Sequence, residues 1–182
     1  KFNKIIKKYP SLKNIDYVYY IRALCYYEQI SHEELDGEYN NLALKNLNEI
    51  IIRFPDSEYA KDSYQKIILV NSNIAAKNMA IGRFYQKNKK YIAALNRYKI
   101  VVNNFEETKF TPEALYRISE IYYSIGMIKD AKKTAAILGY NYPKSKWYQF
   151  SYQNLIKQNR KSLFSDPINK IFNKWVKMTK KK

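Results

Sequence analysis

The sequence predicts an all-α protein, an α-solenoid in which antiparallel helix pairs stack side by side. A spacing pattern of small and bulky residues occurs twice in phase. The 182 residues include only four glycines and five prolines, and 46% are apolar, which favours stacked helices over sheets with many turns. Aromatic–proline dipeptides then close successive segments, because proline blocks the continuation of a helix. These dipeptides are Tyr9-Pro10, Phe54-Pro55 and Tyr142-Pro143.

The repeated spacing is clearest between residues 78 and 143. Gly82 precedes Ala94 by twelve residues, and Ser119 precedes Ala131 by the same interval. A small residue on the first helix and an alanine on the second allow two backbones to approach closely. Bulky residues recur around them at three- and four-residue intervals, as on one helix face. This spacing is typical of tetratricopeptide repeats.

The start of the chain resembles the end of a repeat, because apolar residues in 1–9 share one helical face before Tyr9-Pro10. The next pair is predicted at 14–30 and 38–53. Polar residues 31–37 read as a loop insertion between its helices. We therefore assign 1–157 to one tetratricopeptide-repeat domain. Its parts are the end of a truncated repeat (1–10), three repeats (11–55, 56–106 and 107–143) and a capping helix (144–157).

The repeat at 56–106 is longer than the roughly 34 residues of a plain repeat. An inserted helix accounts for the surplus, with Asp56 or Ser57 as its N-cap. That helix is either separate from the first helix of the following pair or continuous with it. The last pair is expected at 113–125 and 129–139, with Thr111-Pro112 as N-cap and first turn.

The tail, residues 158–182, has a different character. From Lys157 onward the chain carries nine Lys or Arg against one Asp, and apolar residues recur at helical spacing from Ile168. A short amphipathic basic helix is expected there. Its alternatives are a solvated terminus, a helix on an anionic membrane surface or a helix packed on a partner. The candidate contact residues are Phe172, Lys174, Trp175 and Lys177.

The sequence indicates no catalytic chemistry and no cofactor. His32 and Cys25 are the only residues of their types, which excludes serine or cysteine triads, histidine-pair metal sites and internal disulfides. Few glycines leave no phosphate-binding loop. Cys25 lies in an apolar helical run, so a buried thiol is predicted. We therefore expect a protein that is not an enzyme and binds no metal.

Nineteen tyrosines suggest a binding surface. Residues that follow a core position on the first helix of a pair are expected to face a concave groove. Rigid amphipathic rings there suit an extended peptide, because aromatic anchors carry much of the binding energy at interfaces. The alternative is a composition bias of an AT-rich genome. The groove candidates are Tyr20, Leu24, Tyr27, Met79, Arg83, Gln86, Tyr116, Glu120 and Tyr123.

The net charge of +17 favours acidic partners, anionic membranes or nucleic acid. A nucleic-acid binder would stack bases on aromatic side chains in a basic groove. The excess charge is concentrated in the tail, however, and no recognition motif is present. Nucleic acid is therefore not expected as a partner.

The irregular features together resemble the BamD family. The matching landmarks are Tyr9-Pro10, the run from Ile15 to Leu24, the insertion before Asn41, and Leu47 to Ser63 with its Arg53-Phe54-Pro55-Asp56-Ser57 motif. The inserted helix and the segment from Ala80 to Phe105 follow the same layout. The resemblance covers about residues 1–157. The family normally has about five repeats, so its first repeat and most of its second are expected to be missing here.

That resemblance implies a non-enzymatic scaffold of the outer-membrane β-barrel protein assembly machinery, a lipoprotein held on the periplasmic face of the outer membrane. The lipid would sit on a cysteine upstream of residue 1, since Cys25 lies within a helix. The C-terminal repeats would dock periplasmic domains of the barrel-forming subunit, alongside other assembly lipoproteins. The N-terminal repeats would receive the C-termini of unfolded outer-membrane proteins. A different tetratricopeptide adaptor would share the fold and groove but not these partners.

Overall fold

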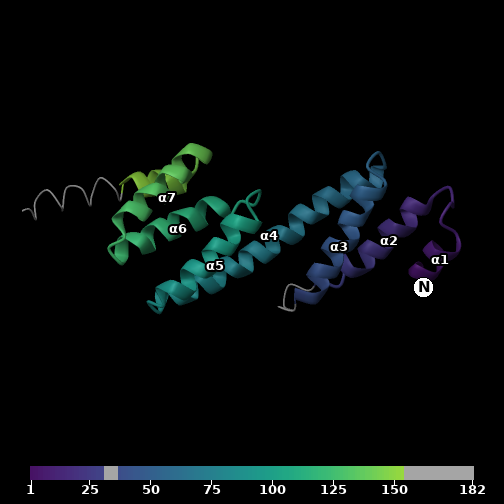
Figure 1. The fold of residues 1–182 in the computed structure, drawn as a ribbon, viewed down its shortest axis with the longest axis horizontal. Coiled ribbons are helices and arrows are strands. Elements are labelled where there is room, and N and C mark those ends of the chain that lie inside the picture. Colours follow the sequence, from purple (N-terminus) through teal and green to yellow (C-terminus); the bar gives the residue numbers. More distant parts are fainter. Residues whose placement is uncertain (31–36, 154–182) are drawn as a thin grey trace, which may run out of the picture.

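The structure, a computed structural model, describes residues 1–30 and 37–153, and these residues form helices without any strand. The prediction of an all-α fold is confirmed. Adjacent helices pack as antiparallel neighbours along the chain (Figure 1). The helices are α1 (Phe2–Lys8), α2 (Ile15–Tyr27), α3 (Gly37–Arg53), α4 (Glu58–Lys87), α5 (Tyr91–Asn104), α6 (Thr111–Ser124) and α7 (Ile128–Asn141), and residues 146–153 are also helical.

Helix α4 joins two groups of helices, α1–α3 at one end of the molecule and α5–α7 at the other (Figure 1). It runs unbroken for 30 residues. The inserted helix and the first helix of the following pair are therefore one continuous element. Ser57 is its N-cap, and its hydroxyl oxygen accepts a hydrogen bond from the Tyr59 backbone N–H at 3.3 Å. This satisfies one of the donors that a helix start leaves unpaired.

Three apolar clusters hold the helices together. One joins α2, α3 and the start of α4, the second joins α4, α5 and α6, and a small third one joins α6, α7 and the residues after α7. Helix α4 contributes to two of them. The fully buried members include Ala23, Leu47, Met79, Tyr98 and Leu138.

The small residues of the repeated pattern lie where the helices approach most closely. Gly82 is buried, and a Cβ atom there would lie 2.5 Å from Cε1 of Tyr98. The Ser119 hydroxyl donates to the Ala131 carbonyl at 3.0 Å, so α6 and α7 touch at the predicted positions. Gly126 lies in the turn that follows α6 and has φ +83°. Glycine adopts this left-handed conformation without steric cost.

Two local predictions are wrong. Thr111 is not the N-cap of α6, because the helix already includes it and its hydroxyl instead donates to the Phe105 carbonyl at 2.9 Å. Cys25 is exposed rather than buried. The buried face of α2 contains Tyr19 and Ala23, and a residue two positions beyond Ala23 points to the other side of the helix.

Several predictions fall outside the described residues. The inserted loop at 31–36, with His32, is one, and the tail with Phe172, Lys174, Trp175 and Lys177 is another. Within 1–30 and 37–153, none of the helices combines the length and the apolar character that crossing a membrane requires.

Candidate functional site

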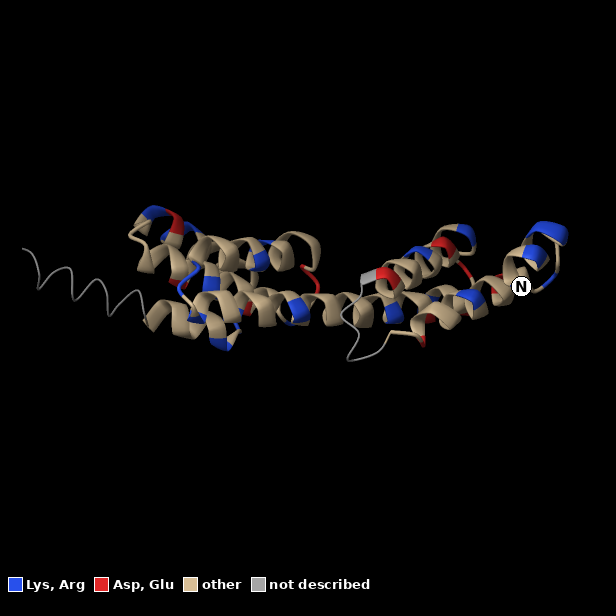
Figure 2. Ribbon diagram, turned by 90° about the horizontal axis from the view of Figure 1, so that it is seen from below, with Lys and Arg blue, Asp and Glu red and all other residues tan. Residues whose placement is uncertain are grey.

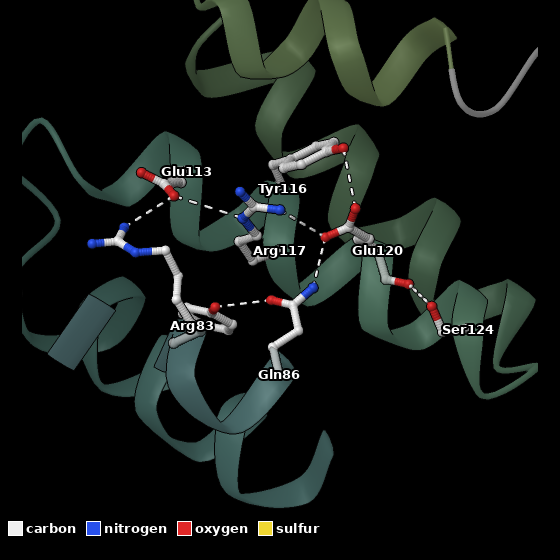
Figure 3. Close-up of polar contacts among 8 residues, drawn as sticks. Arg83, Gln86, Glu113, Tyr116, Arg117, Glu120 and Ser124 are labelled. Atoms are coloured by element: carbon white, nitrogen blue, oxygen red, sulfur yellow. Dashed lines mark hydrogen bonds and ion pairs between the residues drawn. The ribbon is translucent and has the colours of Figure 1, made fainter. Parts of the chain in front are cut away.

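The candidate groove face is built by α2, α4 and α6, the helices that carry the predicted peptide-binding residues. Where α4 and α6 meet, polar side chains form one connected set (Figure 3). We call this set the α4–α6 network. Its members are Arg83 and Gln86 from α4, Tyr98 from α5, and Glu113, Tyr116, Arg117 and Glu120 from α6.

Glu120 is the centre of this network. Its carboxylate accepts hydrogen bonds from Gln86 Nε2 at 2.7 Å, from Arg117 Nη1 at 3.0 Å and from the Tyr116 hydroxyl at 3.4 Å (Figure 3). Charged acceptors make stronger hydrogen bonds than neutral ones. The carboxylate therefore fixes the separation of α4 and α6 and orients a neighbouring ring.

Arg117 is held on two sides. Its guanidinium contacts the Glu113 carboxylate at 3.6 Å as well as Glu120, and lies 5.5 Å from the ring centroids of both Tyr116 and Trp147. Burial alone would lower the pKa of Arg117, but the hydrogen bond and charge of Glu120, aided by Glu113, raise it overall. Arginine suits such a position because its planar group stacks on aromatic faces while it pairs with carboxylates.

The remaining members attach the network to the core. Arg83 Nη1 reaches Glu113 at 3.1 Å. The Tyr98 hydroxyl donates to Gln86 Oε1 at 2.9 Å, and the ring is fully buried. Burial raises the pKa of Tyr98 to about 12. The amide of Gln86 thus links a core tyrosine to the surface carboxylate of Glu120.

A second set lies between α2 and α4, and we call it the α2–α4 cluster. The Tyr20 hydroxyl donates to Asp62, and its ring stacks on Tyr59 with 5.0 Å between centroids. Lys66 pairs with Asp62 at 3.3 Å and lies 5.1 Å from the centroid of the Tyr27 ring. Burial, together with the hydrogen bond and charge of Asp62, raises the pKa of Tyr20 well above its ordinary value.

The structure gathers six of the nine groove candidates into these two sets. Tyr20 and Tyr27 belong to the α2–α4 cluster. Leu24 is half-buried on α2, and Tyr123 is half-buried on α6 with a hydroxyl that has no hydrogen-bond partner among the described residues. The candidates in the α4–α6 network are Arg83, Gln86, Tyr116 and Glu120.

Two of the candidates are core residues. Tyr116 is only 9% exposed and belongs to the small apolar cluster of α6 and α7. Met79 is fully buried in the core between α4, α5 and α6. The buried face of α4 contains Ala75, Met79 and Gly82, which recur at four- and three-residue intervals on one side of a helix. Met79 is therefore a core residue and not part of the groove face that the sequence predicted.

Sequence reasoning missed Glu113, Arg117, Asp62 and Lys66. A signal for them was present, since Glu113 and Arg117, like Asp62 and Lys66, stand four residues apart, and opposite charges at that spacing pair on a helix surface. The contact of Arg117 with the Trp147 ring joins residues 30 positions apart and has no local signal.

The polar groups of the two sets are already paired with neighbouring side chains. The carboxylates of the two sets are engaged by cations, amides or hydroxyls, and within 1–30 and 37–153 no group of His, Cys, Asp and Glu could hold a metal ion. Paired charges and fixed rings give a rigid surface with aromatic and hydrogen-bonding groups side by side. Such a surface suits a peptide chain, which offers both apolar side chains and backbone polar groups.

The chain is similar to known proteins over most of its length. The family model of YfiO, described as an outer membrane lipoprotein, matches residues 1–138. The proteins named outer membrane protein assembly factor BamD from Caulobacter vibrioides and Rickettsia prowazekii are 41% and 44% identical to this chain, over 84% and 83% of its length. The protein of that name from Neisseria meningitidis is 26% identical over 80%. The matches cover 50%, 60% and 58% of those relatives, so the chain spans little more than half their length.

Proposed function

Because this chain belongs to the YfiO family of outer membrane lipoproteins, we propose that it is a non-enzymatic scaffold of the machinery that assembles β-barrel proteins in the outer membrane. The observation that carries the proposal is its 41–44% identity to two proteins named outer membrane protein assembly factor BamD. In the full-length protein, a lipid on a cysteine upstream of residue 1 would hold the scaffold on the periplasmic face of that membrane.

The scaffold has two tasks in this proposal. Helices between Glu113 and Lys157 dock the periplasmic domains of the barrel-forming subunit and neighbouring assembly lipoproteins. The groove face of α2, α4 and α6 receives the C-termini of unfolded outer-membrane proteins. Support for the second task comes from the half-buried rings of Tyr20 and Tyr59, which stack with 5.0 Å between their centroids. Aromatic side chains of an incoming strand can pack against such rings.

Docking is tested by co-purification with the periplasmic domains of the barrel-forming subunit. Lys132 and Lys133 are exposed on α7, and their joint replacement, Lys132→Glu with Lys133→Glu, should weaken the complex at least tenfold if α7 lies in the interface. Lys7→Glu with Lys8→Glu on α1 is the matched control, because it changes the same charge on exposed residues at the other end of the molecule. No complex with the unaltered chain, or equal affinity for both variants, refutes the docking proposal.

Peptide binding is tested by site-specific crosslinking. A photoreactive residue at Tyr27 or Tyr123 should capture a C-terminal barrel peptide, whereas the same group at Tyr140 should not. Tyr140 is 89% exposed on α7, so it controls for simple accessibility. Capture at Tyr140 as strong as at the other two positions would remove the groove from the proposal.

A further inference from the structure

One edge of the molecule carries exposed apolar side chains that neither the core nor the groove face uses. It consists of the turn between α4 and α5 with its flanking residues, and of the turn between α6 and α7. Both turns lie at the same end of the helix pairs, because α6 runs parallel to α4 (Figure 1). We call this surface the tip edge. Its large apolar members are Phe84, Ile92, Ile125, Met127 and Ile128.

These apolar residues project into solvent. Ile92 is 78% exposed and Phe84 is 63% exposed, while Ile125, Met127 and Ile128 are each exposed by at least two fifths. A soluble surface carries single residues of this kind routinely. Ile92 and Ile125 instead line one hollow, and exposed apolar residues that are grouped and rimmed by polar residues mark a contact with a partner or a membrane.

The tip edge also has a hollow with a basic rim. Lys89 and Lys90 stand beside Tyr91, Ile92 and Ala93, and the hollow of about 700 Å³ between them reaches Asn96 and Ile125. Its floor is mainly apolar. A group that fits there combines an apolar chain with a negative charge at the level of the two ammonium groups.

The charge around this edge is mainly positive. No Asp or Glu occurs from Phe84 to Phe105, a stretch that contains Lys87, Lys89 and Lys90. The α6–α7 side adds Lys129, with Asp130 next to it. None of these four lysines forms an ion pair among the described residues. Figure 2 shows Lys and Arg distributed along the helices, with Asp and Glu among them.

We propose that the tip edge binds an anionic phospholipid surface, with the apolar residues entering the headgroup region and the lysines contacting lipid phosphates. Lysine is depleted at protein–protein interfaces, whereas its long stem and charged head suit the boundary between lipid and water. The residues lie at helix-hairpin ends, which project from the body and can enter a planar surface. This contact is additional to the scaffold role and does not depend on it.

An environment-sensitive dye gives a local readout of this contact. In the full chain with Cys25→Ser, which removes the only other thiol, the dye is placed at Ile92→Cys or at Ile52→Cys. Ile52 lies on α3 and is 79% exposed, so the two positions are matched in exposure. Vesicles of phosphatidylglycerol should shift the emission to the blue at position 92 only, and vesicles of phosphatidylcholine should shift it at neither position.

Vesicle sedimentation measures the energetic contribution of each group. Ile92→Asn should lower partitioning onto phosphatidylglycerol by about tenfold, and Lys87→Gln with Lys90→Gln should lower it by about thirtyfold at low salt. Ile52→Asn and the charge-matched pair Lys7→Gln with Lys8→Gln are the controls, and they should leave partitioning within about twofold.

Three outcomes overturn the proposal. Vesicle binding without a dye response at position 92 would assign that binding to residues 158–182 or another surface. An equal response at positions 52 and 92 would show non-specific adsorption. A response at position 92 to the periplasmic domains of the barrel-forming subunit, but not to vesicles, would make the tip edge a protein-binding surface.

Discussion

Replacement of Gly82 by alanine tests the close approach of α4 and α5 that the fold depends on. A Cβ atom at this position would lie 2.5 Å from Cε1 of Tyr98 and 2.9 Å from two other ring atoms, whereas ordinary contacts begin near 3.4 Å. The helices must therefore separate by about 1 Å, or the ring must move. Tyr98 is fully buried and its hydroxyl donates to Gln86, so the ring has no free space to enter.

The net effect follows from two opposing terms. Overpacking of this kind costs about 2–3 kcal/mol, and the better helix propensity of alanine returns about 1 kcal/mol. Gly82→Ala should therefore lower the free energy of unfolding by about 1–2 kcal/mol, which corresponds to a fall of about 4 °C in Tm for a chain of this size. Urea denaturation followed by far-UV circular dichroism measures the change.

A control experiment removes the Tyr98 ring that the new methyl group would meet. In a Tyr98→Leu background the ring atoms that meet the new methyl group are absent, so Gly82→Ala should become neutral or stabilising. The coupling between the two substitutions should then exceed about 1 kcal/mol. If Gly82→Ala stabilises the unaltered chain, or if the loss is the same in both backgrounds, close packing of α4 on α5 is not the reason for glycine at this position.

Three further predictions concern the α4–α6 network and the turns. Glu120→Ala should lower the free energy of unfolding by roughly 1–3 kcal/mol in urea melts, because Gln86 and Arg117 lose a charged acceptor; an unchanged midpoint would contradict a central role. Lys89 has φ +57°, so Lys89→Gly should raise stability by about 1 kcal/mol, and Lys89→Ala, the control, should not. The free energy of unfolding should fall as pH rises from about 10 to 12, because burial raises the pKa of Tyr98 and the unfolded chain therefore loses this proton at a lower pH. Tyr98→Phe should reduce that fall. The same pH profile for the variant and the unaltered chain would refute the prediction.

The helix pairs were predictable because their signals are local. Spacing around Gly82 and Ser119, closing prolines and the N-cap at Ser57 all act within a few residues, and the structure places helices there. The continuity of α4 was not decided by the sequence. Asn71-Ser72-Asn73 in its middle are weak helix formers, and the helix persists through them because its two halves pack on separate cores.

The candidate site was predictable only in part, because its contacts are not local. The rule that a residue following a core position faces the groove placed Arg83, Gln86 and Glu120 on one surface, but it failed for Met79, whose side of α4 is set by packing on α5. Pairing between α4 and α6, as in the bond from Gln86 to Glu120, depends on a helix separation that no spacing rule provides.

The position of the network bears on how a groove of this kind could select a ligand. Arg83 and Gln86 of α4 bind Glu113 and Glu120 of α6. Arg117 pairs with the same two carboxylates, so these charges are already satisfied. A peptide that displaced one of these pairs would leave a partly buried charge without a partner, which is costly. The network is therefore better suited to fixing the shape of the proposed groove than to exchanging partners. Affinity for a ligand would then come from half-buried rings beside it, such as Tyr27 and Tyr123, whose faces can gain contacts without breaking an ion pair.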